Sequence, residues 1–128
     1  MVGGGQGAFI GAIHRIAARL DNKYRLVAGA LSSDPERAAE SALHLGIEAK
    51  RSYQSFAQMA KAEAARPDGI EAVAIVTPNN LHADVAVAFL EAGIHVICDK
   101  PLSVSYLEGL RIKPVSYTHL TLPTTGVV

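Results

Sequence analysis

Short apolar runs, separated by longer stretches of helical period, make up the hydrophobic pattern of this chain. Three runs predict buried strands, because strands covered on both faces carry near-continuous apolar sequence: 25–31 (RLVAGAL), 72–77 (AVAIVT) and 95–98 (HVIC). Ser52 and Tyr53 predict a short edge strand. Because strands alternate with helices, the pattern favours an α/β fold with a doubly wound parallel sheet.

Helices are expected between these strands. Apolar residues recur at helical spacing over 9–20, which predicts the first helix. Ser33 and Glu36 have capping-box spacing around Pro35 and predict a second helix that ends at 45, before a glycine. Two more helices are expected at 56–63, closed by the turn at 67–69, and from an Asn79 or Asn80 cap to 92, before Gly93.

The first predicted strand is incomplete. Only Met1 and Val2 precede the glycine cluster at 3–7, whereas a strand usually runs about five or six residues. We therefore expect Met1 to lie inside the true first strand.

Residues 114–128 (PVSYTHLTLPTTGVV) differ from the rest of the chain. They contain no Asp, Glu, Lys or Arg and hold four of the five threonines, and no helical or alternating period runs through them. Positions 114–124 match the translation of a transposase adapter from a sequencing library; a natural Thr-rich tail is the alternative. We expect a dinucleotide-binding domain at 1–113 and a disordered, adapter-derived segment at 114–128.

Composition fits one packed domain and excludes several partner classes. The chain is 49% hydrophobic, and twelve basic and twelve acidic residues give a formal net charge of zero. Without a basic block or a bilayer-long apolar stretch, we expect no nucleic-acid partner and no membrane partner. One cysteine, Cys98, and no signal-like N-terminus fit a cytoplasmic location. The histidines and carboxylates show no metal-site spacing, so no metal is expected.

The segment 3–11 (GGGQGAFIG) joins the first predicted strand to the first helix. Phosphate binding needs backbone amides that approach without Cβ obstruction, and a helix N-terminus that faces the anion. One alignment to G-x-G-x-x-G/A uses Gly3, Gly5 and Ala8; a second uses Gly11 as the last glycine, with three residues inserted. Both stay open, as does a plain glycine-rich turn. The candidate cofactor-binding residues here are Gly3, Gly5, Gln6, Gly7, Ala8, Phe9 and Ile10.

The end of the second strand discriminates between NAD and NADP. An acid there binds the ribose 2′-hydroxyl of NAD, whereas a nearby arginine accommodates the 2′-phosphate of NADP. Ser32 and Ser33 follow this strand, Arg37 lies one turn into the helix, and Asp34 is taken up in helix capping. The pattern favours NADP, with NAD as the alternative; a solvated helix arginine is the other interpretation of Arg37.

An acid, a lysine and a proline end the last predicted strand. Because proline cannot extend a sheet ladder, the strand stops before Pro101 and presents Lys100 at its carboxyl end, where open α/β sheets bind ligands. A lysine amine there can accept the proton of a reacting hydroxyl during hydride transfer. A surface lysine in a strand–helix turn is the alternative.

Three segments together resemble the Gfo/Idh/MocA oxidoreductases, which include glucose–fructose oxidoreductase and inositol dehydrogenases: GGGQGAFIG, TPNNLH at 77–82 and AGIHVICDKP at 92–101. The resemblance covers about residues 1–113 and implies a Rossmann-like domain that binds NAD or NADP. In that family a second α+β domain follows. It supplies most of the substrate pocket and the interface through which the parent protein is expected to form a homo-oligomer.

The resemblance also implies roles for single residues. Lys100 would be the catalytic residue, near the nicotinamide and the reacting hydroxyl, beside Asp99, where many members have Glu. The cofactor's ribose and nicotinamide side would be lined by Thr77, Pro78 and Asn79, with His82 nearby. The family's further catalytic Asp and His, in a D-x-x-x-H element, are absent from this sequence.

The expected function is that of an NAD(P)-dependent oxidoreductase of the sugar or polyol dehydrogenase type. It would transfer hydride between a nicotinamide cofactor and a secondary hydroxyl. This chain would hold only the cofactor-binding half and be inactive alone. A non-catalytic dinucleotide-binding protein or a non-functional fragment is the alternative. The other titratable residues are expected to be structural or solvent-facing, or to lie in the tail: His14, His44, His95, Cys98 and His119.

Overall fold

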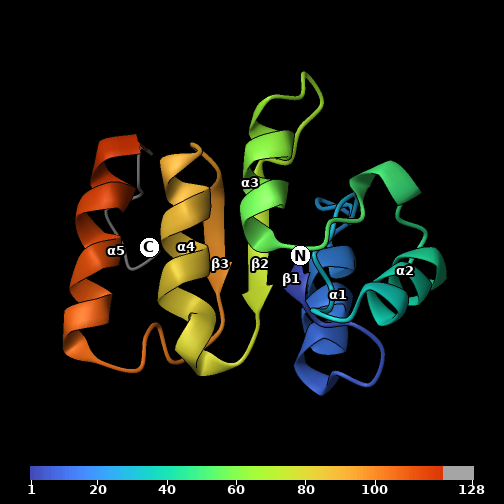
Figure 1. The fold of residues 1–128 in the computed structure, drawn as a ribbon, viewed down its shortest axis with the longest axis horizontal. Coiled ribbons are helices and arrows are strands. Elements are labelled where there is room, and N and C mark those ends of the chain that lie inside the picture. The colour runs from blue at the N-terminus through green and yellow to red at the C-terminus, as the bar shows by residue number, and fades with distance from the viewer. Residues whose placement is uncertain (120–128) are drawn as a thin grey trace.

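A computed structural model describes the backbone of residues 1–119 and the side chains of residues 1–117. Its central sheet is parallel, with strands β1 (Val2–Gly3), β2 (Ala72–Val76) and β3 (His95–Cys98) in the order β1-β2-β3 (Figure 1). Two bridges, Val2 with Ala30 and Gly29 with Ser52, extend the sheet beyond β1. The predicted edge strand at Ser52 therefore exists as one bridge.

The strand predicted over 25–31 pairs only near its end, because its neighbour β1 is so short. The Met1 amine donates to the Ala28 carbonyl at 2.9 Å, and the Gly3 amide donates to the Ala30 carbonyl at 2.9 Å. Met1 is 6% exposed and Val2 3%. Met1 therefore already pairs as part of the sheet, next to β1.

The helices are α1 (Phe9–Leu20), α2 (Pro35–His44), α3 (Phe56–Ala64), α4 (His82–Glu91) and α5 (Tyr106–His119). The prediction that Ser33 caps α2 is wrong, because the Asp34 carboxylate caps this helix by accepting from the Glu36 amide at 3.1 Å. Asp34 directly precedes Pro35, so its short side chain reaches the first free amide of the helix.

The predicted asparagine cap of α4 is also wrong. Residues Asn79–Leu81 form a 3₁₀ turn, and α4 begins at His82 with no side-chain hydrogen bond at its cap, Leu81. The 3₁₀ turn places both asparagines before the first helical residue, and Asn79 and Asn80 are exposed.

Two apolar clusters cover the two faces of the sheet, which makes it doubly wound. Alternate residues of β2 belong to different clusters: Val73 and Ile75 pack with α3 and α4, whereas Ala74 and Val76 pack on the other face with Ile10 of α1 and Ala42 of α2. This alternation follows from the two-residue period of a strand. It explains why β2 is apolar throughout.

The helix α5 extends into the segment that was predicted to be disordered. It continues past residue 113 through Pro114 to His119 and packs beside α4, with Ile112 and Ser116 each 1% exposed. The expectation of disorder from 114 is thus wrong for 114–119, and 120–128 lie outside the described residues. The sequence did carry a signal for this helix, because Ser105 and Glu108 have capping spacing and the Glu108 amide donates to the Ser105 hydroxyl at 3.2 Å. The adapter origin stays a prediction.

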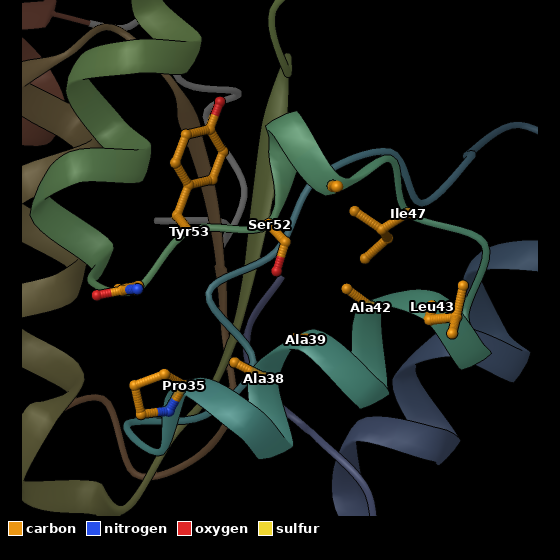
Figure 2. Close-up of a pocket in the computed structure, with 10 residues that line it drawn as sticks. Pro35, Ala38, Ala39, Ala42, Leu43, Ile47, Ser52 and Tyr53 are labelled. Carbon is orange, nitrogen blue, oxygen red and sulfur yellow. The ribbon is translucent and has the colours of Figure 1, made fainter.

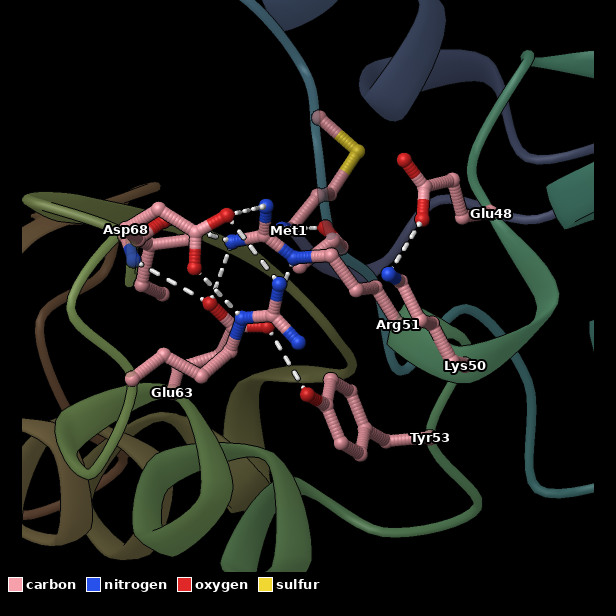
Figure 3. Close-up of polar contacts among 10 residues, drawn as sticks. Met1, Glu48, Lys50, Arg51, Tyr53, Glu63 and Asp68 are labelled. Carbon is pink, nitrogen blue, oxygen red and sulfur yellow. Dashed lines mark hydrogen bonds and ion pairs between the residues drawn. The ribbon is translucent and has the colours of Figure 1, made fainter.

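A buried ion pair ties the sheet edge to α3 (Figure 3). Arg51 ends a 3₁₀ turn, η1 (Ala49–Arg51), and its Nε donates to Oε1 of Glu63 at 3.0 Å. The Tyr53 hydroxyl donates to the same carboxylate at 2.8 Å, and both charged residues are buried. Burial alone would raise the pKa of Glu63, but the hydrogen bonds from Arg51 and Tyr53 outweigh it and hold the pKa below its ordinary value. In the described part of the chain, no helix is long and apolar enough to cross a bilayer.

Candidate functional site

The carboxyl ends of the three strands meet at one edge of the sheet. Gly3 lies opposite Val76, and Ile75 lies opposite Cys98, so the residues that follow each strand emerge side by side. These residues are the glycine loop after β1, Thr77 after β2, and Asp99 and Lys100 after β3. The structure therefore brings together segments that lie far apart in the sequence, at the edge where α/β sheets bind ligands.

The glycine loop needs its glycines at specific positions. Gly3 and Gly4 have φ of +79° and +77°, and a Cβ on Gly3 would lie 2.9 Å from the Val76 carbonyl oxygen. A Cβ on Gly5 would lie 2.9 Å from the Leu31 carbonyl oxygen, and one on Gly11 would lie 2.6 Å from the Gly4 Cα. Gly11 thus allows α1 to pack closely on the loop, which favours the alignment that takes Gly11 as the last glycine.

Side chains from two helices hold this loop in place. The Ser41 hydroxyl of α2 accepts from the Gln6 amide at 3.0 Å, and Arg15 of α1 donates to the Gly4 carbonyl at 2.8 Å. Sequence reasoning missed both residues. Ser41 sits in an ordinary helix, but Arg15 follows Gly11 by one helical turn, which is a spacing that could have indicated it.

The N-terminus of α1 points its free amides into the same region. Its cap, Ala8, makes no side-chain hydrogen bond in the described structure, and its first turn holds no acidic residue. The helix dipole and the amides of the first turn therefore remain available to an anion. Phe9 and Ile10 form this turn, and the Phe9 side chain is 78% exposed.

Arg37 faces the glycine loop across an open cavity. Gln6, Gly7, Ala8 and Arg37 line a cavity of about 570 Å³. Ser32 and Ser33 precede α2 on the same side, and the Ser32 hydroxyl accepts from the Asp34 amide at 3.1 Å. The Asp34 carboxylate is engaged as the helix cap, so the cationic Arg37 is the charged group of this wall.

Thr77 carries a buried polar atom that the described protein atoms leave without a partner. Its Oγ1 is buried and makes no hydrogen bond within the described part of the chain. Such an atom costs free energy unless something else satisfies it. Pro78 and Asn79 follow it and are exposed. The hydroxyl is therefore an unsatisfied polar group at the end of β2, within the described residues.

Lys100 is exposed immediately after β3. Its neighbour Asp99 is held on both its main chain and its side chain. The Asp99 amide donates to the Ile75 carbonyl at 3.2 Å, and Oδ1 lies 3.3 Å from Nε2 of His14. Burial, with a smaller effect of Asp99, raises the pKa of the Cys98 thiol to about 11. Cys98 is therefore a thiol rather than a reactive thiolate at neutral pH.

His82 does not line the open site. It is 1% exposed, with Nδ1 2.6 Å from the Pro101 carbonyl oxygen and Nε2 3.1 Å from the Thr77 carbonyl oxygen. Both ring nitrogens therefore contact the backbone of the loops that carry the site. This geometry gives no support to a direct contact between His82 and a cofactor.

A second hollow lies elsewhere, between α2 and the edge segment of the sheet (Figure 2). Its volume is about 220 Å³, and its walls include Ala38, Ala42, Ile47 and Tyr53. It contains none of the predicted site residues. In the described residues, no group of three or more His, Cys, Asp or Glu could hold a metal ion.

Comparison with known proteins identifies the family. The profile described as "Oxidoreductase family, NAD-binding Rossmann fold", that of the Gfo/Idh/MocA proteins, matches residues 1–115. The chain belongs to the Gfo/Idh/MocA oxidoreductase family. The uncharacterized oxidoreductase YfiI of Bacillus subtilis is 46% identical over 91% of this chain and 30% of its own length.

Solved structures agree on the fold. An oxidoreductase from Sinorhizobium meliloti is 55% identical with a TM-score of 0.88, over 93% of this chain and 33% of that one. An inositol dehydrogenase homolog from Azotobacter vinelandii, complexed with NADH and myo-inositol, is 43% identical with a TM-score of 0.89, over 93% of this chain and 31% of that one. The chain thus has an NAD-binding Rossmann fold and spans about a third of these relatives.

The residues present fit a dinucleotide. The glycine loop lies so close to the neighbouring strands that a Cβ at Gly3 or Gly5 would clash with the Val76 or Leu31 carbonyl oxygen, the N-terminus of α1 is uncapped by side chains, and Thr77 Oγ1 lacks a protein partner in the described residues. These features lie along the same edge as Lys100.

Proposed function

We propose that this chain is the cofactor-binding part of an NAD(P)-dependent sugar or polyol dehydrogenase. The observation that carries the proposal is the position of Lys100 after β3, next to the end of β2 where the Thr77 hydroxyl has no partner in the described residues, and on the same sheet edge as the glycine loop. When bound, the cofactor would supply the hydride chemistry, and the protein supplies binding and orientation.

The predicted residues of the glycine loop and of the strand ends each have a part in this proposal. The backbone amides of Gly3, Gly5, Gln6, Gly7 and Ala8 and of the first turn of α1, with Phe9 and Ile10, hold the diphosphate. Thr77, Pro78 and Asn79 hold the ribose on the nicotinamide side. Lys100 Nζ orients the reacting hydroxyl and takes its proton, and Asp99 fixes the backbone beside it.

The preferred cofactor in this proposal is NADP. Arg37 shares a cavity with the glycine loop, and Ser32 and Ser33 can donate to a phosphate without repelling it. The Asp34 carboxylate accepts from the Glu36 amide in the helix cap, which occupies one of its oxygens and makes this acid less available to bind a 2′-hydroxyl. Calorimetric titration of the chain with NADP⁺ and with NAD⁺ tests the choice, and tighter binding of NAD⁺ would overturn it.

The substrate contacts are proposed to lie outside this chain. Its relatives are about three times longer, and the Azotobacter homolog binds myo-inositol in such a longer protein. We expect residues 1–128 to bind a dinucleotide but not to turn over inositol or glucose, and the parent protein to act on a sugar or polyol and to form homo-oligomers through its other domain. Turnover by purified residues 1–128 would contradict this.

Sequencing the genomic locus with long reads separates the catalytic proposal from its alternative. A reading frame that continues past residue 113 into a domain with a D-x-x-x-H element supports the dehydrogenase. A locus that encodes residues 114–128 as written and then stops favours a non-catalytic dinucleotide-binding protein, for which cofactor binding is the function to test.

A further inference from the structure

Lys100 lies between two residues that are each anchored by a histidine. Asp99 precedes it and contacts His14 of α1, whereas Pro101 follows it and contacts His82 of α4. The two histidines come from different helices, and the sequence predicted neither of them as a support for Lys100. The lysine itself is exposed, so its backbone position depends on what holds its neighbours.

His82 joins the ends of two strands. Carbonyl oxygens only accept hydrogen bonds, and a neutral imidazole has one N–H, so the neutral ring donates to one of the two carbonyl oxygens and merely contacts the other. Nδ1 lies 2.6 Å from the Pro101 oxygen, in the loop after β3, and Nε2 lies 3.1 Å from the Thr77 oxygen, at the end of β2. Because His82 is 1% exposed, water competes little for these contacts.

His14 supplies the second anchor. Its Nε2 lies 3.3 Å from Asp99 Oδ1, and the two side chains are 22% and 31% exposed. The longer distance and the partial exposure make this contact weaker than that of His82. The Asp99 amide is in addition bonded to β2 through the Ile75 carbonyl.

We infer that His82 and His14 are positioning residues that fix the loop carrying Lys100, with His82 as the principal one through its Nδ1 contact to Pro101. The relevance of this anchoring to hydride transfer rests on the proposed function of Lys100. The anchoring of the loop itself does not depend on that function.

Hydrogen exchange in the 128-residue chain tests this inference. In His82→Asn the amide nitrogen can occupy the position of Nδ1 and keep the contact with Pro101. In His82→Gln it can occupy the position of Nε2 and keep the contact with Thr77, so the two variants separate the two contacts. His82→Phe and His82→Gln should speed exchange of the Asp99 amide, which donates to the Ile75 carbonyl, about tenfold, the factor that losing one buried hydrogen bond produces. His82→Asn should stay within about threefold of the unaltered chain.

Controls distinguish a local role from general destabilisation. His95→Phe changes an exposed histidine at the start of β3 and should leave exchange of the Asp99 amide unchanged. Exchange in the core of β2 should also stay unchanged in the Asn and Gln variants. His14→Phe should speed exchange of the Asp99 amide less than His82→Gln does.

The outcomes separate the inference from the proposed function. Equal exchange in the Asn and Gln variants, or faster exchange throughout β2 in both, would overturn the positioning role. If His82→Phe does not fold, the Asn–Gln comparison still decides. Failure of the unaltered chain to bind NADP⁺ or NAD⁺ would contradict the proposed function and leave the exchange result standing.

Discussion

At the scale of a single residue, Thr77 is a candidate site residue that lowers the stability of the free protein. Its buried hydroxyl makes no hydrogen bond in the described structure, and an unpaired polar atom destabilises the free protein. Valine has nearly the same shape without the hydroxyl. We predict that Thr77→Val raises the free energy of unfolding of the free chain by about 1 kcal/mol.

The same substitution should weaken dinucleotide binding by about fivefold, because the ligand then loses one hydrogen bond. Urea unfolding and calorimetric titration of the same samples measure both effects. A variant that is destabilised, or that binds as well as the unaltered chain, would show that the hydroxyl has no ligand to satisfy. Thr77→Ser, which keeps the hydroxyl, is the matched control.

Arg37 gives a second prediction at this scale. Its guanidinium shares a cavity with the glycine loop and would pair with a 2′-phosphate. Arg37→Gln should raise the Kd for NADP⁺ about tenfold and leave the Kd for NAD⁺ within about twofold. Lys50→Gln serves as a control, since Lys50 is an exposed cation that pairs with Glu48. Equal losses for both cofactors would remove Arg37 from the 2′-phosphate site.

Gly11 illustrates how one element depends on another. A Cβ at this position would lie 2.6 Å from the Gly4 Cα, so α1 would have to move away from the loop. Gly11→Ala should therefore destabilise the chain by about 2 kcal/mol, despite the higher helix propensity of alanine, and weaken dinucleotide binding.

Ala12→Gly, one residue on and exposed, is the matched control. It should cost about 1 kcal/mol by helix propensity alone and leave cofactor affinity unchanged. Thermal unfolding with and without NADP⁺ measures both variants. A stabilising effect of Gly11→Ala would mean that the close approach of α1 and the loop is wrong.

Local sequence patterns predicted the helices and strands themselves better than they predicted the helix caps. The helix at 9–20 and the strand at 95–98 match their structural bounds because both have strong periodicity or apolar runs. The caps at Ser33, Asn79 and Asn80 were wrong because several neighbouring polar residues could each serve, and only tertiary placement decides. The supporting residues Ser41 and His14 were missed because their partners, Gln6 and Asp99, lie far away in the sequence.

At the scale of the whole molecule, the Met1 amine affects stability through pH. Burial lowers the pKa of this group from 8.0 to about 5. The unfolded chain therefore binds more protons than the folded chain between pH 5 and pH 8, so the free energy of unfolding rises with pH across this window. The gain is at most about 4 kcal/mol.

Urea unfolding at pH 5.5 and pH 8 measures this gain, with the acetylated N-terminus as the control. Acetylation keeps an N–H that can donate to the Ala28 carbonyl but removes the titration. The pH dependence in this window should therefore be much smaller in the acetylated chain. Identical pH profiles for the two chains would contradict a buried, titrating amine.

The cofactor site is tested most directly by NMR of the backbone amides of the ¹⁵N-labelled chain during titration with NADP⁺ and NAD⁺. Binding at the carboxyl edge of the sheet should give saturable shifts at Gly3–Gly11, at 32–37, at 77–79 and at 99–100, with few elsewhere. No shifts at millimolar dinucleotide, or shifts confined to the hollow between α2 and residues 47–54, would contradict a cofactor site at the carboxyl edge of the sheet.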